Sequence, residues 1–101
     1  MLLSNGITTT FGARYYKDQL STVFIYAEIR KASNFTIGEV VATLPVGFRP
    51  KTTMAYGATF QVGSTSYAQA VILVESDGSV SIDNSGVNYS RFLLNISFQS
   101  E

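Results

Sequence analysis

The residues that could carry out chemistry in this 101-residue chain are few, because it contains neither histidine nor cysteine. Their absence excludes a thiolate zinc site, a cysteine nucleophile and every catalytic arrangement built on histidine. Seven acidic and seven basic side chains remain, and they balance to a net charge of zero. The sequence therefore predicts neither a metal ion nor a cofactor.

Paired carboxylates are the remaining route to catalysis, since glycosidases place two of them about 5 to 10 Å apart. In the second half of the chain the nearest candidates are Asp77 and Asp83. Six residues of extended strand span roughly 20 Å at about 3.3 Å per residue, so these two cannot act together through one strand. No motif surrounds the lysines to suggest a serine–lysine pair. We expect a protein that is not an enzyme, with a polysaccharide depolymerase as the weaker alternative.

Residues suited to binding a saccharide are better represented. A sugar site combines an aromatic platform for the apolar face of the ring with fixed hydrogen-bonding groups, and a phosphate substituent would add an arginine. Gln69 and Arg91 lie opposite the core residues of their expected strands, free to meet a ligand or a neighbouring subunit. For each candidate, a solvated polar residue near a strand end is an equally good interpretation. The candidate saccharide-binding residues are Tyr67, Gln69, Asp83, Asn84, Tyr89 and Arg91.

Composition argues against two classes of partner. A chain with zero net charge and no cluster of lysine and arginine lacks the phosphate-neutralising groups that supply most of the affinity for nucleic acid. No run approaches the roughly 18 apolar residues of a transmembrane helix, so membrane insertion is not expected. Charged residues make up 14% of the chain and apolar residues 46%, which leaves uncharged surface suited to contact with other subunits.

The elements that must position the candidate residues are strands. No window shows a sustained helical period, whereas apolar side chains alternate with polar ones in several short segments. About seven strands with turn signals every 8–12 residues fit an all-β fold, a small antiparallel β-sandwich or jelly-roll-like barrel, in a single domain over residues 1–101. The expected strands cover residues 7–15, 23–29, 39–43, 54–62, 68–74, 80–82 and 92–98.

Residues 44–50 predict a stiff corner in the middle of the chain. Its two prolines fix φ and remove two backbone donors, and Gly47 between them can supply a positive φ. We expect Phe48 to plug the open end of the sandwich and Arg49 to bond nearby carbonyls. Further along, Asp77-Gly78 lies between two apolar runs and predicts a tight hairpin.

Other connections are expected as a turn at residues 17–19 and loops at residues 31–34, 63–66 and 83–88. Val71, Leu73 and Leu93 are apolar positions on faces that should point away from the core. Apolar residues on both faces of a strand indicate a second packed layer or a symmetric interface. The sequence therefore favours an oligomer.

In order and spacing these signals resemble the C-terminal receptor-binding modules of bacteriophage tail fibres and baseplates. The resemblance is carried by VATLPVGFRP at residues 41–50, VESDGSVSI at residues 74–82 and FLLNISF at residues 92–98. The match spans roughly residues 37–98. In size the chain is also similar to the head domain of a lactococcal siphophage receptor-binding protein.

The resemblance implies a homotrimer at the tip of a phage tail or baseplate that recognises saccharide on the host cell wall. It also implies that shoulder and neck regions precede residue 1 and connect the head to other tail proteins. The family often supplies a tryptophan and a histidine to its sugar site, and this chain has neither. The alternative is a structural domain that trimerises and caps a fibre without touching the receptor.

Overall fold

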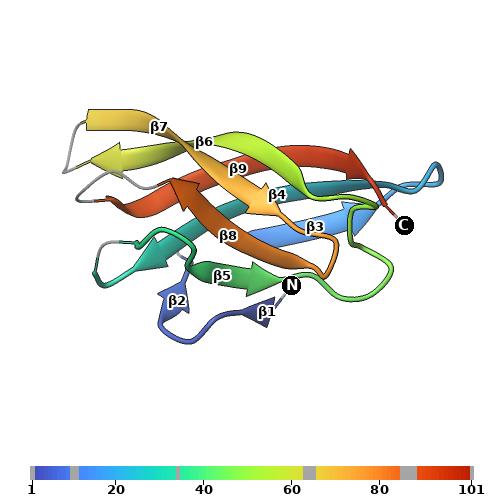
Figure 1. Cartoon of the computed structure of the whole chain (residues 1–101), viewed down its shortest axis with the longest axis horizontal. Coiled ribbons are helices and arrows are strands. Elements are labelled where there is room, and N and C mark those ends of the chain that lie inside the picture. The colour runs from blue at the N-terminus through green and yellow to red at the C-terminus, as the bar shows by residue number, and fades with distance from the viewer. Residues whose placement is uncertain (1, 10–11, 34, 63–65, 85–88, 101) are drawn as a thin grey trace.

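The computed structural model describes residues 2–9, 12–33, 35–62, 66–84 and 89–100. Within these ranges the chain forms nine strands and no helix, in an elongated body of 39 × 23 × 23 Å (Figure 1). The strands are β1 (Leu2–Leu3), β2 (Ile7–Thr8), β3 (Ala13–Lys17), β4 (Thr22–Lys31), β5 (Val40–Thr43), β6 (Met54–Val62), β7 (Ser66–Val74), β8 (Ser79–Asn84) and β9 (Tyr89–Gln99).

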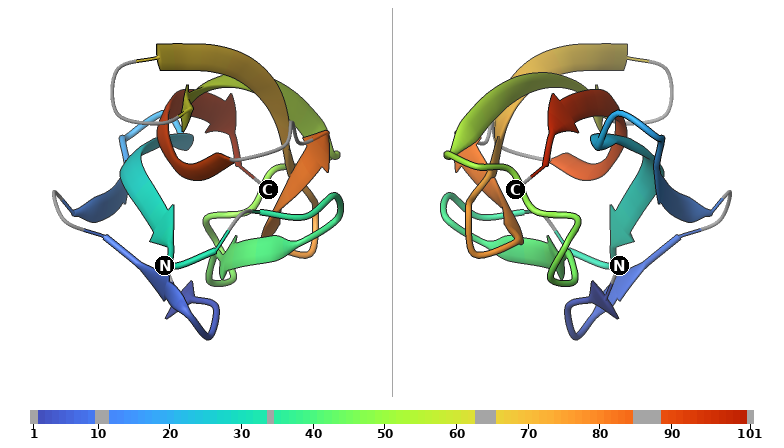
Figure 2. Two further views of the ribbon diagram at one scale, coloured as in Figure 1. Left: turned by 90° about the vertical axis from the view of Figure 1, so that its left-hand side faces the viewer. Right: turned by 90° about the vertical axis from the view of Figure 1, so that its right-hand side faces the viewer.

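The strands form one antiparallel sheet that rolls into a nearly closed barrel, as the end-on views in Figure 2 show. Their order is β1-β5-β8-β7-β6-β9-β4-β2, and β3 also pairs with β4. The N-terminal segment draws the two sides of the sheet together, because β1 pairs with β5 whereas β2 pairs with β4. The all-β prediction is confirmed, and the barrel form is the one of the two expected architectures that is observed.

The barrel interior is filled by the alternating apolar residues that the sequence predicted. On β4 and β9 the paired residues Ile25 and Ile96 are both buried, as are Ile29 and Phe92. This follows from the two-residue repeat of a strand, which sends every second side chain to the same face. The buried apolar residues of the seven longer strands are Val23, Ile25, Ala27, Ile29, Val41, Ala42, Ala58, Phe60, Ala70, Ile72, Val74, Val80, Ile82, Phe92, Leu94, Ile96 and Phe98.

The strand expected over residues 7–15 is interrupted, so that prediction was wrong in part. Thr8 pairs with Arg30 and Ala13 pairs with Ala27, which leaves four residues of one strand facing two of the other. Gly12, at a φ of +106°, permits the irregular backbone at this bulge. Its carbonyl accepts a hydrogen bond from the amide of Glu28. Alternation alone could not reveal the bulge, because an excess of two residues leaves the alternation in phase.

The corner and the Asp77-Gly78 hairpin, predicted separately, pack against each other. Gly47 and Gly78 adopt φ values of +94° and +92°, as their turns require. The amide of Leu44 donates to the carbonyl of Gly78 over 2.8 Å, and Nε of Arg49 donates to the carbonyl of Leu44 over 3.0 Å. Arg49 therefore bonds a carbonyl of the corner, as expected, and the hairpin tip supports that corner from the other side.

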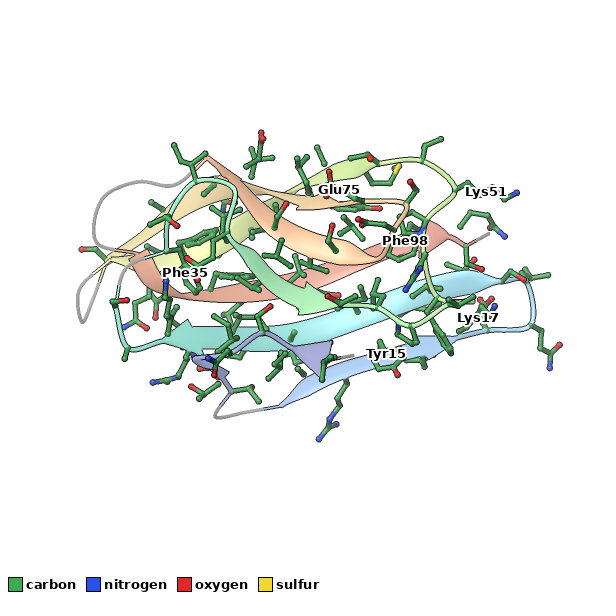
Figure 3. The ribbon with its side chains drawn as sticks, turned by 60° about the horizontal axis from the view of Figure 1, so that its bottom comes forward. Tyr15, Lys17, Phe35, Lys51, Glu75 and Phe98 are labelled. Atoms are coloured by element: carbon green, nitrogen blue, oxygen red, sulfur yellow. The ribbon has the colours of Figure 1, made fainter. Side chains whose placement is uncertain are left out.

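The side of β3 that faces away from β4 meets the corner through side chains. Lys17 donates to the carbonyl of Gly47 over 2.6 Å, and its ammonium lies 5.4 Å from the centre of the Phe48 ring. Tyr15 meets Phe48 edge to face, with ring centres 5.0 Å apart. Phe48 is thus half-buried against β3. We call this junction the β3–corner seam, and Figure 3 labels Tyr15 and Lys17 along it.

Phe35 closes the opposite end of the barrel (Figure 3). It lies in the β4–β5 connection, is 3% exposed, and its ring packs against those of Phe60 and Phe92. No periodic pattern surrounds it in the sequence, so it was not assigned to the core. The expected loop at 31–34 begins later, since β4 continues through Lys31.

The turn between β3 and β4 also lies one residue later than predicted. The amide of Ser21 donates to the carbonyl of Asp18, and one carboxylate oxygen of Asp18 accepts from the amides of Leu20 and Thr22. Ser21 adopts a φ of +63°. An aspartate that accepts from the following amides commonly starts a turn, and this one displaces the turn to residues 18–21.

Glu39 holds the segment that carries Phe35. Its carboxylate accepts from the ammonium of Lys31 over 2.8 Å and from the amide of Thr36 over 3.0 Å. Burial by itself would raise the pKa of Glu39, but the hydrogen bonds from Lys31 and Thr36 and the charge of Lys31 together hold that pKa below its ordinary value.

Acid should therefore weaken this end of the barrel through Glu39. Because the folded-state pKa of Glu39 is lower than its ordinary value of 4.5, the stabilisation is present at neutral pH and is lost as the pH falls below 4.5 and through the folded-state pKa. We expect Glu39→Gln to be less stable than the parent by up to about 1 kcal/mol at pH 7, and equally stable at low pH. Urea unfolding of both proteins across this range measures the difference, and a difference independent of pH would contradict the assignment.

Candidate functional site

Strand register brings three of the predicted binding residues onto one outer face of the barrel. Gln61 on β6 pairs with Tyr67 on β7 and with Arg91 on β9, and Arg91 pairs with Arg30 on β4. Directly opposite residues point to the same face of a sheet, so these four side chains form one row across four strands. The next row contains Gln69, Thr59, Leu93 and Glu28. We call these eight residues the outer patch.

The outer patch is organised around a buried carboxylate. Glu28 is 1% exposed although it lies on the outer face of β4. Its Oε2 accepts from Nε of Arg30 at 2.5 Å and from Nε of Arg91 at 2.7 Å. Thr9, from the bulge between β2 and β3, reaches the other carboxylate oxygen over 3.4 Å. Two guanidinium groups around one carboxylate leave an excess of one positive charge at this position.

Arg91 is thereby held in place, which corrects the expectation that its side chain is free to meet a ligand. The side chain is 17% exposed, pairs with Glu28, and donates from Nη1 to Oε1 of Gln61 over 2.6 Å. The guanidinium of Arg30 is the more accessible one, with its side chain 41% exposed. Of the two arginines, Arg30 is therefore better placed to contact a molecule from outside.

Tyr67 and Gln69 are the exposed members of the patch on β7. Tyr67 is 59% exposed and presents a ring beside Gln61. Nε2 of Gln69 donates to the hydroxyl of Thr59 over 3.1 Å, which fixes the orientation of its amide. An exposed aromatic ring next to oriented amide and guanidinium groups is the combination that binds a sugar.

The remaining predicted residues lie elsewhere or outside the described side chains. Asp83 is exposed on β8, on the other side of β7, at an irregularity between the pairs Val71–Asn84 and Ile72–Ile82. It is therefore separated from the row of Tyr67. The side chains of Asn84 and Tyr89 lie outside the part of the chain that the structure describes, although their backbones pair with Val71 and Val62.

Four members of the patch were missed by sequence reasoning: Glu28, Arg30, Thr59 and Gln61. In the sequence, Glu28 and Arg30 alternate with the apolar residues Ala27 and Ile29, which puts them opposite the core face of their strand and was the only available signal. Their proximity to Tyr67 depends on the pairing of β4 with β9 and of β9 with β6. Alternation along a single strand carries no information about that pairing.

The apolar positions expected to contact other subunits are divided by the fold. Val71 and Leu73 are half-buried on the outer face of β7, whereas Leu93 is 40% exposed in the middle of the outer patch. Uncharged surface therefore lies within the patch at Leu93 and adjoins the patch along β7.

A depression of about 460 Å³ lies between β1, β3 and the corner. Leu2, Tyr15 and Pro45 contribute to its mostly apolar walls, and Nε of Arg49 is already bonded to the carbonyl of Leu44. It offers fewer oriented polar groups than the outer patch. The outer patch is therefore the stronger candidate for a ligand site.

The described residues contain no group of three or more acidic side chains that could hold a metal ion. They also contain no helix long and apolar enough to cross a membrane.

Comparison with solved structures identifies the fold. The chain superimposes on the crystal structure of the head domain of phage bIL170, described as a receptor-binding domain of a lactococcal phage, with a TM-score of 0.75. The chain has the fold of a phage receptor-binding head. The alignment covers 99% of this chain and 94% of the bIL170 head domain, at 14% sequence identity. No protein-family model and no curated protein sequence matches the chain. The resemblance drawn from the sequence is thus confirmed at the level of the phage head fold.

Proposed function

We propose that this chain is the head domain of a phage receptor-binding protein and attaches the virion to saccharide on the host cell wall. The fold shared with the bIL170 head over nearly the whole chain supports the first part. The outer patch supports the second, because it joins an exposed tyrosine to oriented amide and guanidinium groups. We place the chain at the tail tip or baseplate of the virion, and no catalytic step is proposed.

Within the patch, Tyr67 offers its ring to the apolar face of a sugar. Gln69 and Gln61 offer oriented amides, and the half-exposed guanidinium of Arg30 donates to hydroxyl or acidic oxygens. Arg91, which is mostly buried, orients the amide of Gln61 through its hydrogen bond to Oε1. Asp83, Asn84 and Tyr89 remain candidates for contacts at the edge of the site.

We further propose a homotrimer in which Val71 and Leu73 on β7 contribute to the subunit contact, with a preceding region joining the head to other tail proteins. A shallow, polar site of this kind binds a single saccharide weakly. Several heads on one particle would raise attachment through effective concentration.

Removing exposed contacts of the patch should weaken cell attachment without affecting folding. We expect Tyr67→Ala and Gln69→Ala each to reduce binding of the fluorescently labelled domain to susceptible Gram-positive cells about tenfold, the equivalent of about 1.4 kcal/mol. Val46→Ala is the matched control, because Val46 is 76% exposed on the corner and away from the patch. Flow cytometry on a panel of strains, before and after removal of wall polysaccharide, measures the effect.

Parental binding that survives both patch substitutions would place the receptor site elsewhere on the head. Folded protein that labels no strain would contradict the receptor-binding proposal itself.

A further inference from the structure

A second group of side chains lies on the same outer face, further along β4 and β9. Tyr16 on β3 pairs with Phe24 on β4, and two residues along β4 lies Tyr26, which pairs with Arg14 on β3. Across the other side of β4, Tyr26 pairs with Asn95 on β9. We call Tyr16, Phe24 and Tyr26 the aromatic platform. None of its residues belongs to the outer patch.

The aromatic platform is accessible from outside the barrel. The rings of Tyr16 and Phe24 stack with centres 4.9 Å apart and planes only 15° from parallel. Tyr16 is 61% exposed and Tyr26 is 60% exposed. Exposed tyrosines of this kind usually serve recognition, since burial of the rings elsewhere would recover their hydrophobic free energy.

Polar groups surround the aromatic platform on both sides. Asn95 and Ser97 on β9 are exposed and pair with Tyr26 and Phe24, and Arg14 is exposed on β3. Phe24 and Tyr26 therefore each have a hydrogen-bonding side chain as a cross-strand neighbour, whereas Tyr16 has Phe24. Rings framed by hydroxyl, amide and guanidinium groups match the two-sided chemistry of a sugar, which has apolar C–H faces and a polar rim.

We propose that the aromatic platform is a second saccharide-binding subsite, in which a sugar ring stacks on Tyr26 or on the Tyr16–Phe24 pair and Asn95 bonds its hydroxyls. The inference takes its ligand class from the proposed function but uses separate residues. A second copy of the chain is a less suitable partner for the aromatic platform than a sugar. Two of the three aliphatic positions suited to such a contact, Val71 and Leu73, lie on β7, on the far side of β6 and β9, and only Leu93 lies near the platform.

The spacing of the two sites fits one extended ligand. Arg91 and Asn95 both lie on the outer face of β9, four residues or about 13 Å apart. Leu93 lies between them on the same strand, so uncharged surface connects the two sites. A polysaccharide chain following β9 would contact the outer patch and the aromatic platform together, and a single sugar would contact only one.

Nuclear magnetic resonance of the whole chain tests the inference, with glucose, galactose, rhamnose and N-acetylglucosamine as individual probes. The ring signals of Tyr16 and Tyr26 report on the platform, and the side-chain amides of Gln61 and Gln69 report on the outer patch. With at least one sugar we expect the ring signals of Tyr16 and Tyr26 to shift and to reach saturation at millimolar sugar concentrations. We expect Tyr26→Ala to weaken these shifts at least about fivefold, Tyr26→Phe to retain them, and Tyr67→Ala to leave them unchanged.

Each pattern of shifts has a separate meaning. Shifts of the glutamine amides without shifts of the Tyr16 and Tyr26 rings would overturn the platform and leave the proposed function standing. Ring shifts alone would support the platform and move the receptor site away from the outer patch. If no sugar shifted either the Tyr16 and Tyr26 ring signals or the glutamine amide signals, both proposals would be overturned. Ring signals that broaden with protein concentration in the absence of sugar would show that a second copy covers the platform, and would overturn it.

Discussion

Replacement of Gly78 by alanine is expected to lower the free energy of unfolding by about 3 kcal/mol or more. Two costs combine at this position. Gly78 adopts a φ of +92°, which is unfavourable for any residue with a Cβ. A Cβ added there would lie 2.5 Å from the carbonyl oxygen of Leu44 and 2.7 Å from Nε of Arg49. The hairpin and the corner would have to separate, with the loss of the Leu44–Gly78 hydrogen bond.

Gly47→Ala is the matched control for this prediction. Gly47 has nearly the same φ, +94°, and lies in the corner against which the hairpin packs, but an added Cβ would meet nothing within 4 Å. Its substitution should cost only the backbone term, about 1 to 2 kcal/mol. Urea unfolding of the two variants separates the steric cost from the conformational one. Equal losses in the free energy of unfolding would mean that the corner moves to accommodate the added methyl group at little cost, despite its close contacts with Gly78.

Replacement of Glu28 by alanine is expected to be the second large effect, about 3 kcal/mol. The substitution leaves the mostly buried guanidinium of Arg91 facing that of Arg30 without the carboxylate that both bind. Glu39→Ala is the control, because its pair with Lys31 is more exposed and should be worth about 1 kcal/mol or less. Both are measured as changes in the free energy of unfolding.

A paired substitution tests whether charge is the cause. If the loss in Glu28→Ala comes from an uncompensated guanidinium, Glu28→Met combined with Arg91→Met should recover most of the stability, since Arg30 can turn towards solvent. A double variant no more stable than Glu28→Ala would indicate that packing of the Glu28 side chain, rather than its charge, matters.

Two kinds of sequence signal predicted much of the fold. Alternation of apolar residues identified the core face of each long strand, including Ile25 and Phe60, because the side-chain period of a strand is fixed by its geometry. Proline, glycine and aspartate identified the corner and the hairpin, because these residues impose particular φ values or hydrogen bonds. Both signals are local, and neither depends on which strand lies next to which.

What the sequence could not supply was pairing between distant segments. Arg91 was expected to be free because its own strand places it opposite the core, and only the pairing of β9 with β4 puts Glu28 within reach. Phe35 was missed for a similar reason, since its burial depends on Phe60 and Phe92 rather than on neighbours in the chain. Of the candidate site, Tyr67 and Gln69 were identified by residue type. Arg30 and Gln61 could be identified as members of the site only from the strand register in the structure.

The β3–corner seam also bears on how many copies of this barrel can lie close together. The side of β3 away from β4 is a strand edge, and strand edges invite pairing with another chain. Here Lys17 reaches across to the carbonyl of Gly47 and Phe48 packs on Tyr15, so side chains cover the edge. A charged lysine at this position also opposes the approach of a foreign strand. Neighbouring copies of this barrel are thereby kept from joining edge to edge into a continuous sheet.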